Sequence, residues 1–219
     1  MLTPHKIARL ITDREYASHV VRARLYGFLR RRLHMAVPLV TEDRRVLERI
    51  IFQHYRRDPH IRTVLFVGCE SYTAHYQRCY FAAHDYWTID PDPTRSKFGA
   101  RQHVVARLEE IGRHFPAGFF NLIICNGVYG WGLNVREDCD AAIAQCHACL
   151  ADGGHLLFGW SDVPARDPAP LQQVSGFSRF IPYTFPAFGA SQRVTDTPLR
   201  HTYHFYRKAE LKNDAQSRR

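Results

Sequence analysis

The sequence predicts an α/β fold with a doubly wound, mostly parallel sheet and an N-terminal helical extension. Continuous runs of β-branched and aromatic residues recur after residue 62, as expected for strands that are buried on both faces. A helical pattern separates the two strongest runs, and strands that alternate with helices favour a parallel sheet. The 219 residues, 45% hydrophobic and 23% charged, suffice for one packed α/β domain with an extension.

The first sixty residues are predicted to be mostly helical. In residues 3–33 apolar side chains recur at steps of three and four, which is the period of an amphipathic helix. A second helix is expected to begin after Thr41, a favourable N-terminal cap, and to end at Asp58-Pro59. We assign residues 1–60 to an N-terminal helical cap.

Strands dominate the pattern from residue 63 onward. They are predicted over residues 63–68, 86–90, 103–105, 119–126 and 155–160. The alternating stretch 202–208 indicates a late strand, which we expect to be antiparallel. Residues 136–154 have a helical pattern with acidic residues in the first turn and glycines after its end. We assign residues 61–208 to one α/β domain and expect residues 209–219 to be a disordered tail.

Composition restricts the class of protein. No window approaches 18 consecutive apolar residues, and the first residues carry charges and a proline where a signal peptide needs an apolar stretch. We therefore expect a soluble, cytoplasmic protein with no membrane partner. The six cysteines lie in apolar or helical surroundings, which favours reduced core thiols. Cys146 and Cys149 have no second pair at a suitable spacing, so no metal site is expected.

The net charge of +9 is concentrated in the first sixty residues, which carry 13 Lys and Arg against 6 Asp and Glu. A basic segment raises the alternative of nucleic acid or an acidic partner. The aromatic and basic stacking pattern of an RNA-binding module is missing from the sequence. We therefore favour a helical cap with solvated arginines, and the sequence carries no signal for the oligomeric state.

Small and polar residues follow the first two predicted strands, where open α/β sheets bind ligands. Gly68, Cys69 and Glu70 come after the first strand, and a small residue there lets a ligand approach the backbone. Asp90 and Pro91 come at the end of the second. A carboxylate there can accept hydrogen bonds from a ribose diol, and an ordinary turn carboxylate is the alternative.

The segment ICNGVYGWGLN, residues 124–134, ends the fourth strand with an amide, two aromatic rings and three glycines. The glycines, Gly127 among them, favour a loop that a ligand approaches closely over a packed one. The alternatives are a strand-end cap for Asn126 and a hydrophobic lid for Tyr129 and Trp131.

Lesser candidates follow the fifth strand and lie in the late one. Ser161 and Asp162 could bind a substrate or cap a turn. Of His201 and His204, one could act as a general base, whereas the plain alternative is that both complete a sheet edge.

Together these motifs resemble the class I S-adenosylmethionine-dependent methyltransferases over residues 60–208. VLFVGCES occupies the place of the family's glycine-rich loop, WTIDPDP that of its acidic second motif, and FFNLIICNGVY that of its fourth-strand motif. CLADGGHLLFGW is similar to the helix, Gly-Gly turn and fifth strand that close the site. The chain departs from the family pattern at Phe66, Glu70 and Tyr72, and has Asn121 where aspartate is common, so the first motif is degenerate.

The resemblance implies S-adenosylmethionine as the cofactor and a small-molecule amine or hydroxyl as the methyl acceptor, in small-molecule biosynthesis. Asn126 and Tyr129 keep the first and fourth positions of the family's fourth-strand motif, which implies a catalytic role for both. An amide oxygen can accept a hydrogen from an attacking amine, and an aromatic face attracts a sulfonium. The residues expected to bind the cofactor are Gly68, Cys69, Glu70, Asp90, Pro91, Asn126, Gly127 and Trp131.

Two other functions stay open. A cyclase or lyase on the same fold would let the cofactor's own amine attack its γ-carbon and would release methylthioadenosine. A non-catalytic RNA- or protein-binding module on a decayed methyltransferase fold is the second alternative. The insertion at residues 161–200, rich in proline and aromatic residues, is expected to form a lid over the substrate.

Overall fold

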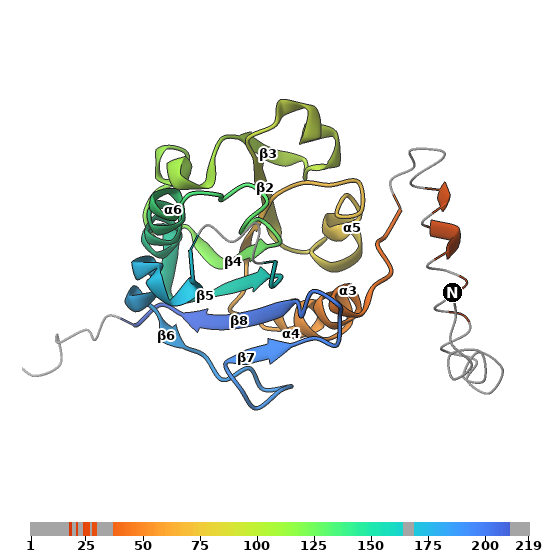
Figure 1. The fold of residues 1–219 in the computed structure, drawn as a ribbon. Coiled ribbons are helices and arrows are strands. Elements are labelled where there is room, and N and C mark those ends of the chain that lie inside the picture. The colour runs from red at the N-terminus through yellow and green to blue at the C-terminus, as the bar shows by residue number, and fades with distance from the viewer. Residues whose placement is uncertain are drawn as a thin grey trace, which may run out of the picture.

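The structure, a computed structural model, describes residues 37–163 and 169–210, together with scattered positions between residues 18 and 29. Its strands are β1 (Thr63–Val67), β2 (Asp85–Asp90), β3 (Gln102–Val105), β4 (Phe120–Asn126), β5 (Leu150–Trp160), β6 (Ile181–Pro182), β7 (Gln192–Val194) and β8 (Thr202–Arg207). They form one sheet in the order β3-β2-β1-β4-β5-β8-β6, with β7 also paired to β8 (Figure 1).

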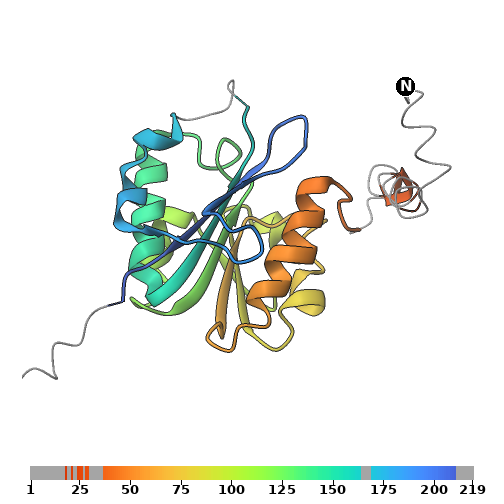
Figure 2. The same ribbon diagram turned by 90° about the horizontal axis from the view of Figure 1, so that it is seen from below.

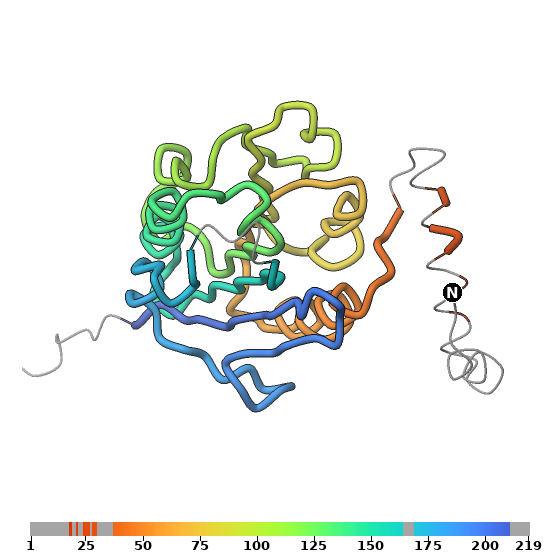
Figure 3. The backbone as a smooth tube through the Cα atoms, in the orientation of Figure 1, coloured from red at the N-terminus to blue at the C-terminus, as the bar shows by residue number. Residues whose placement is uncertain are grey.

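The five strands from β1 to β5 are parallel, which confirms the doubly wound sheet predicted from the sequence. β8 runs antiparallel beside β5, as predicted for the late strand, and Figure 3 traces its return into the sheet. Along the chain, β1 to β3 are added outward on one side of the sheet, and β4 and β5 are then added on the other side of β1. The switch point of this topology therefore lies between β1 and β4, where a doubly wound sheet binds its ligands.

Helices cover both faces of the sheet (Figure 2). The α-helices are α3 (Glu42–Val46), α4 (Phe52–Tyr55), α5 (Tyr76–Tyr80) and α6 (Arg136–Cys149), and a π-helical turn, η1 (Leu47–Ile51), joins α3 to α4. Shorter 3-10 helices are η2 (Pro93–Phe98), η3 (Leu108–Arg113), η4 (Leu171–Gln173) and η5 (Ser175–Arg179). Among the described residues, no helix is both long and apolar enough to cross a membrane.

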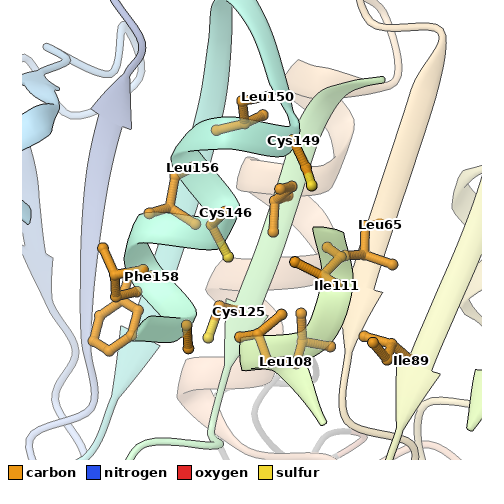
Figure 4. Close-up of a cluster of buried hydrophobic side chains, with 14 of the residues drawn as sticks. Leu65, Ile89, Leu108, Ile111, Cys125, Cys146, Cys149, Leu150, Leu156 and Phe158 are labelled. Carbon is orange, nitrogen blue, oxygen red and sulfur yellow. The ribbon is translucent and has the colours of Figure 1, made fainter. Parts of the chain in front are cut away.

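One apolar core lies between the sheet and the helices α6 and η3, which cover one of its faces (Figure 4). Four thiols pack in it: Cys125 from β4 with Cys139, Cys146 and Cys149 from α6. All six cysteines are free, and five of them are buried, whereas Cys79 is exposed. Because burial raises the pKa of the Cys146 thiol, this group stays protonated and serves the core as a small apolar side chain.

The second core lies on the opposite face, under the helix of residues 42–55. Phe52 from this helix is fully buried, and its ring centroid lies 5.0 Å from that of Tyr76, which in turn lies 5.3 Å from that of Phe66 in β1. The sequence prediction put this helix in a cap separate from the α/β domain. The same apolar cluster contains buried residues of β1, β4 and β8, so this helix packs on one face of the sheet.

Two predicted segments fall largely outside the described residues, namely the helix over residues 3–33 and the tail over residues 209–219. The segment at 161–200, predicted as a lid, is described except for residues 164–168. Ser175 donates a hydrogen bond of 3.0 Å to Asp140 of α6, and β6 and β7 both pair with β8. The described part of this segment thus covers α6 and extends the sheet.

Asn121, at the start of β4, fastens the start of β1. Its Oδ1 accepts hydrogen bonds from the backbone N–H groups of Arg62 and Thr63, at 3.0 Å each, and from the Thr63 hydroxyl at 3.1 Å. Only an acceptor oxygen is required for this role, which an asparagine or an aspartate side chain can supply.

We expect Asn121→Ala to lower the free energy of unfolding by about 2 kcal/mol, because two backbone donors lose their partner. Asn121→Asp keeps an acceptor at the same place and is the matched control. Urea unfolding monitored by circular dichroism measures both variants, and an alanine variant as stable as the aspartate variant would contradict the fastening role.

Candidate functional site

A cleft of about 570 Å³ opens at the carboxyl ends of β1, β2 and β4. Its volume is in the range of small-molecule sites, and it lies at the switch point that the topology identifies. Eight of the predicted site residues line it: Gly68, Cys69, Glu70, Asp90, Pro91, Asn126, Gly127 and Trp131. Among the described residues, no group of three or more His, Cys, Asp and Glu side chains is arranged to hold a metal ion.

Gly68 brings the loop after β1 against the loop after β4. Its φ of +83° lies in the left-handed region, and a Cβ built on it would lie 2.9 Å from Cγ1 of Val128. A side chain at this position is therefore excluded by both conformation and space. The consequence is a stretch of bare backbone that a ligand in the cleft can approach.

Asp90 ties the first two loops of the cleft together. Its side chain is buried, with Oδ2 accepting from the Cys69 N–H at 2.7 Å and Oδ1 accepting from the Asp92 N–H at 2.9 Å. A carboxylate has about four acceptor positions, so each oxygen can still accept a further hydrogen bond from a ligand. Asp90 thus fixes the loops and keeps acceptor capacity on the cleft side.

Asn126, the last residue of β4, is held by a side chain from the far end of the sequence. His201 Nε2 donates to Asn126 Oδ1 at 2.9 Å, and the Ser161 hydroxyl lies 2.8 Å from His201 Nδ1. Since the amide oxygen only accepts, Nε2 carries the hydrogen and Nδ1 accepts from Ser161. Asn126 Nδ2 is buried and has no hydrogen-bond partner in the part of the chain that the structure describes.

Burial lowers the pKa of His201 to about 4. The nearby Asp43 carboxylate opposes this shift and the Arg44 guanidinium adds to it. His201 is therefore neutral at neutral pH. It positions the Asn126 amide without adding positive charge to the cleft. His201, Asn126 and Ser161 all line the cleft.

No family model and no curated protein matches the chain in sequence. Solved structures match its fold. The N-methyltransferase NodS from Bradyrhizobium japonicum WM9 is 18% identical, with a TM-score of 0.54 over 77% of this chain and 99% of that one. NodS in complex with S-adenosyl-l-homocysteine gives 17% identity and a TM-score of 0.51 over 84% of this chain and 98% of that one.

A TehB-like S-adenosylmethionine-dependent methyltransferase from Corynebacterium glutamicum ATCC 13032 is 17% identical, with a TM-score of 0.53 over 73% of this chain and 85% of that one. The chain has the class I S-adenosylmethionine-dependent methyltransferase fold. In this methyltransferase fold the cleft lies at the strand ends where the sequence analysis predicted a binding site.

Tyr129 does not line the cleft of the methyltransferase fold, which corrects its predicted catalytic role. Its side chain is 2% exposed, its ring packs near Phe158 and Trp160, and its hydroxyl donates to the backbone oxygen of Ala169. Positive φ angles at two glycines fold the loop back on itself, so that Tyr129 enters the core. The aromatic side chain that this loop presents to the cleft is Trp131, which is 55% exposed.

Glu70 lies at the rim of the cleft and forms an ion pair with Arg95. Arg95 also donates to the Cys69 backbone oxygen at 3.1 Å and approaches Asp92 Oδ2 at 3.4 Å. This network joins the loop after β1 to η2, which follows β2. Glu70 therefore has a structural partner already, and any contact with a ligand would be shared with Arg95.

Sequence reasoning missed Arg44, which lines the cleft from α3. The available signal was its spacing: Arg44 lies three and seven residues before Leu47 and Ile51, on the buried face of the helix. An arginine on that face is unusual because charged side chains are rarely buried without a partner.

Proposed function

We propose that this chain is an S-adenosylmethionine-dependent methyltransferase that acts on a small-molecule amine or hydroxyl. The observation that carries the proposal is Asn126, a buried amide at the end of β4 with an unpartnered Nδ2 in a cleft of suitable size. The methyltransferase fold supports the cofactor class, and NodS, which has this fold, is solved with S-adenosyl-l-homocysteine.

The donor and acceptor set of the cleft fits this cofactor. The acceptor capacity of Asp90 suits a ribose diol, and the bare backbone at Gly68 gives room for close approach. Trp131 offers an exposed aromatic face at the cleft, and cation–π attraction to a sulfonium is worth about 0.5–2 kcal/mol. We therefore propose that these three residues hold the cofactor, together with Cys69, Pro91 and Gly127 from the same loops.

When bound, the cofactor supplies an electrophilic methyl group on a sulfonium. Asn126 orients the acceptor, because Oδ1 retains a second lone pair for a hydrogen of an amine or hydroxyl and Nδ2 can donate. Neutral His201 keeps the amide in one orientation through its hydrogen bond to Oδ1. Such positioning is the main contribution that a protein makes to an in-line displacement.

Calorimetric titration of the full chain with S-adenosylhomocysteine tests the cofactor, and product chromatography tests the reaction. S-adenosylhomocysteine formed from S-adenosylmethionine only in the presence of small amines or alcohols would support the proposal. Methylthioadenosine formed without an acceptor would contradict methyl transfer and would support the cyclase or lyase alternative. Absence of binding would favour the non-catalytic module.

We expect Asn126→Ala to lower turnover by about 100-fold while the affinity for S-adenosylhomocysteine falls less than about tenfold, because the amide acts on the acceptor. Steady-state kinetics and calorimetry measure the two effects separately. Asn134→Ala removes an exposed amide from the same loop and serves as the matched control. Full turnover in Asn126→Ala would remove this residue from the reaction.

A further inference from the structure

A buried cation faces the cleft, and no carboxylate of the described residues lies within hydrogen-bond distance of it. The Arg44 side chain lines the cleft, and the residue is 7% exposed. Its Nη1 donates to the Tyr76 hydroxyl at 3.0 Å, and its guanidinium carbon lies 4.9 Å from the centre of the Tyr72 ring. Both contacts are with tyrosines, and burial raises the pKa of Tyr76, so that its hydroxyl is neutral.

Burial of a charge is costly unless an opposite charge meets it in hydrogen-bonding geometry. The Nε of Arg44 is buried and has no hydrogen-bond partner. Within residues 37–163 and 169–210, the only carboxylate paired with this guanidinium is that of Asp43, with Oδ2 3.8 Å from Nε, which is longer than a hydrogen bond. The guanidinium thus retains at least one donor, Nε, that no described residue uses.

The guanidinium lies beside the end of β4. A Cβ built on Gly127 would be 3.9 Å from Nη2 of Arg44, so the guanidinium faces bare backbone next to Asn126. Asp43 also lines the cleft, and its backbone oxygen accepts from the Tyr203 hydroxyl at 2.9 Å, which anchors the start of α3 to β8. The Arg44 guanidinium and the Asp43 carboxylate, from adjacent residues of α3, therefore lie side by side at one end of the cleft.

We propose that Arg44 is a binding site for the carboxylate of a zwitterionic α-amino-acid group, with Asp43 beside it for the ammonium. A guanidinium matches a carboxylate through two parallel hydrogen bonds, which supplies the missing anion. The neighbouring Asp43 disfavours a dianion such as phosphate. The inference rests on the proposed function for its ligands, because the amino-acid group is either that of the cofactor or that of the methyl acceptor.

The test compares S-adenosylhomocysteine with its decarboxylated analogue, by calorimetry on the full chain. We expect Arg44→Gln to weaken S-adenosylhomocysteine at least about tenfold and to change the affinity for the analogue less than about twofold. Arg45→Gln is the matched control, because Arg45 is exposed and paired with Glu42 at 2.8 Å. If Arg44→Gln does not fold, Arg44→Lys is measured in its place. Lysine keeps the positive charge but cannot form two parallel hydrogen bonds to a carboxylate. It should therefore weaken S-adenosylhomocysteine more than the analogue, by a smaller factor than the glutamine variant.

The acceptor is the second source of the amino-acid group. If the wild-type chain binds S-adenosylhomocysteine and the analogue equally, the loaded protein is titrated with glycine and with acetate. Binding that Arg44→Gln abolishes assigns the carboxylate to the acceptor. If Arg44→Gln lowers the affinity for every ligand equally, or for none of them, the inference is overturned.

Failure of the inference and failure of the proposed function give different results. A wild-type chain that binds S-adenosylhomocysteine, with Arg44 variants that do not discriminate between carboxylate and analogue, overturns only the inference. A wild-type chain that binds no S-adenosylhomocysteine overturns the function. Glycine and acetate titrations of the free chain then decide the role of Arg44 by themselves.

Discussion

Gly159→Ala is expected to displace the Asn126 amide and to cost about 3–5 kcal/mol of stability, because a buried hydrogen-bonded pair is broken in a tightly packed sheet. Gly159 lies opposite Asn126 in the register of β4 and β5. An added Cβ would be 1.9 Å from Asn126 Oδ1 and 3.1 Å from His201 Nε2. The amide must therefore rotate away, which leaves the imidazole N–H of His201 without its acceptor.

The same substitution should lower turnover by about 100-fold or more, since the amide leaves the place where it would meet the acceptor. Urea unfolding and steady-state kinetics measure the two losses. Gly132→Ala is the stability control, because the nearest atom to its Cβ is a backbone oxygen at 3.8 Å. If Gly159→Ala unfolds no more readily than Gly132→Ala, the tight contact between β5 and Asn126 does not exist in solution.

Acidification from pH 6.5 to pH 4 is expected to lower the free energy of unfolding by several kcal/mol. Burial lowers the pKa of His201 and of His155 to about 4 each, and for His155 the Arg207 charge adds to the effect. Above pH 6.5 both imidazoles are neutral in the folded and the unfolded chain. Between pH 6.5 and 4 only the unfolded chain takes up the protons, so stability falls, by up to about 3 kcal/mol for each group.

Unfolding free energies measured in urea at several pH values between 7.5 and 4 test this expectation. His155→Gln and His201→Gln should each remove about half of the contribution that the pair makes to the slope. His114→Gln removes an exposed imidazole and is the matched control. A slope that neither buried substitution alters would assign the acid sensitivity to other groups.

The central strands could be predicted because the local sequence by itself indicates that they are buried. β1 and β4 are buried on both faces and read as continuous apolar runs. β6 and β7 could not be predicted, since they have two and three residues, all exposed, and exist through pairing with β8. Their formation depends on a partner strand, which no local pattern encodes.

The cleft could be predicted to the extent that it consists of strand ends. Asp90 and Asn126 follow from topology alone, because parallel strands bring their carboxyl ends to one edge. The direction of Tyr129 depends on the positive φ angles of Gly127 and Gly130, which spacing does not reveal. His201 and Arg44 reach the cleft from elements 75 and 82 residues away from Asn126 in sequence, a juxtaposition that only the folded chain defines.

The hydrogen bonds from His201 to Asn126 and from Tyr203 to Asp43 have a consequence for synthesis on the ribosome. Tyr203 lies in β8 and His201 directly precedes this strand, which is the last strand of the described residues and pairs between β5 and β6. A nascent chain lacking residues 201–207 has β1 to β5 but neither of these hydrogen bonds. Any ligand of the cleft should therefore engage the polypeptide only after β8 has emerged from the exit tunnel, and should then stabilise the finished domain by mass action.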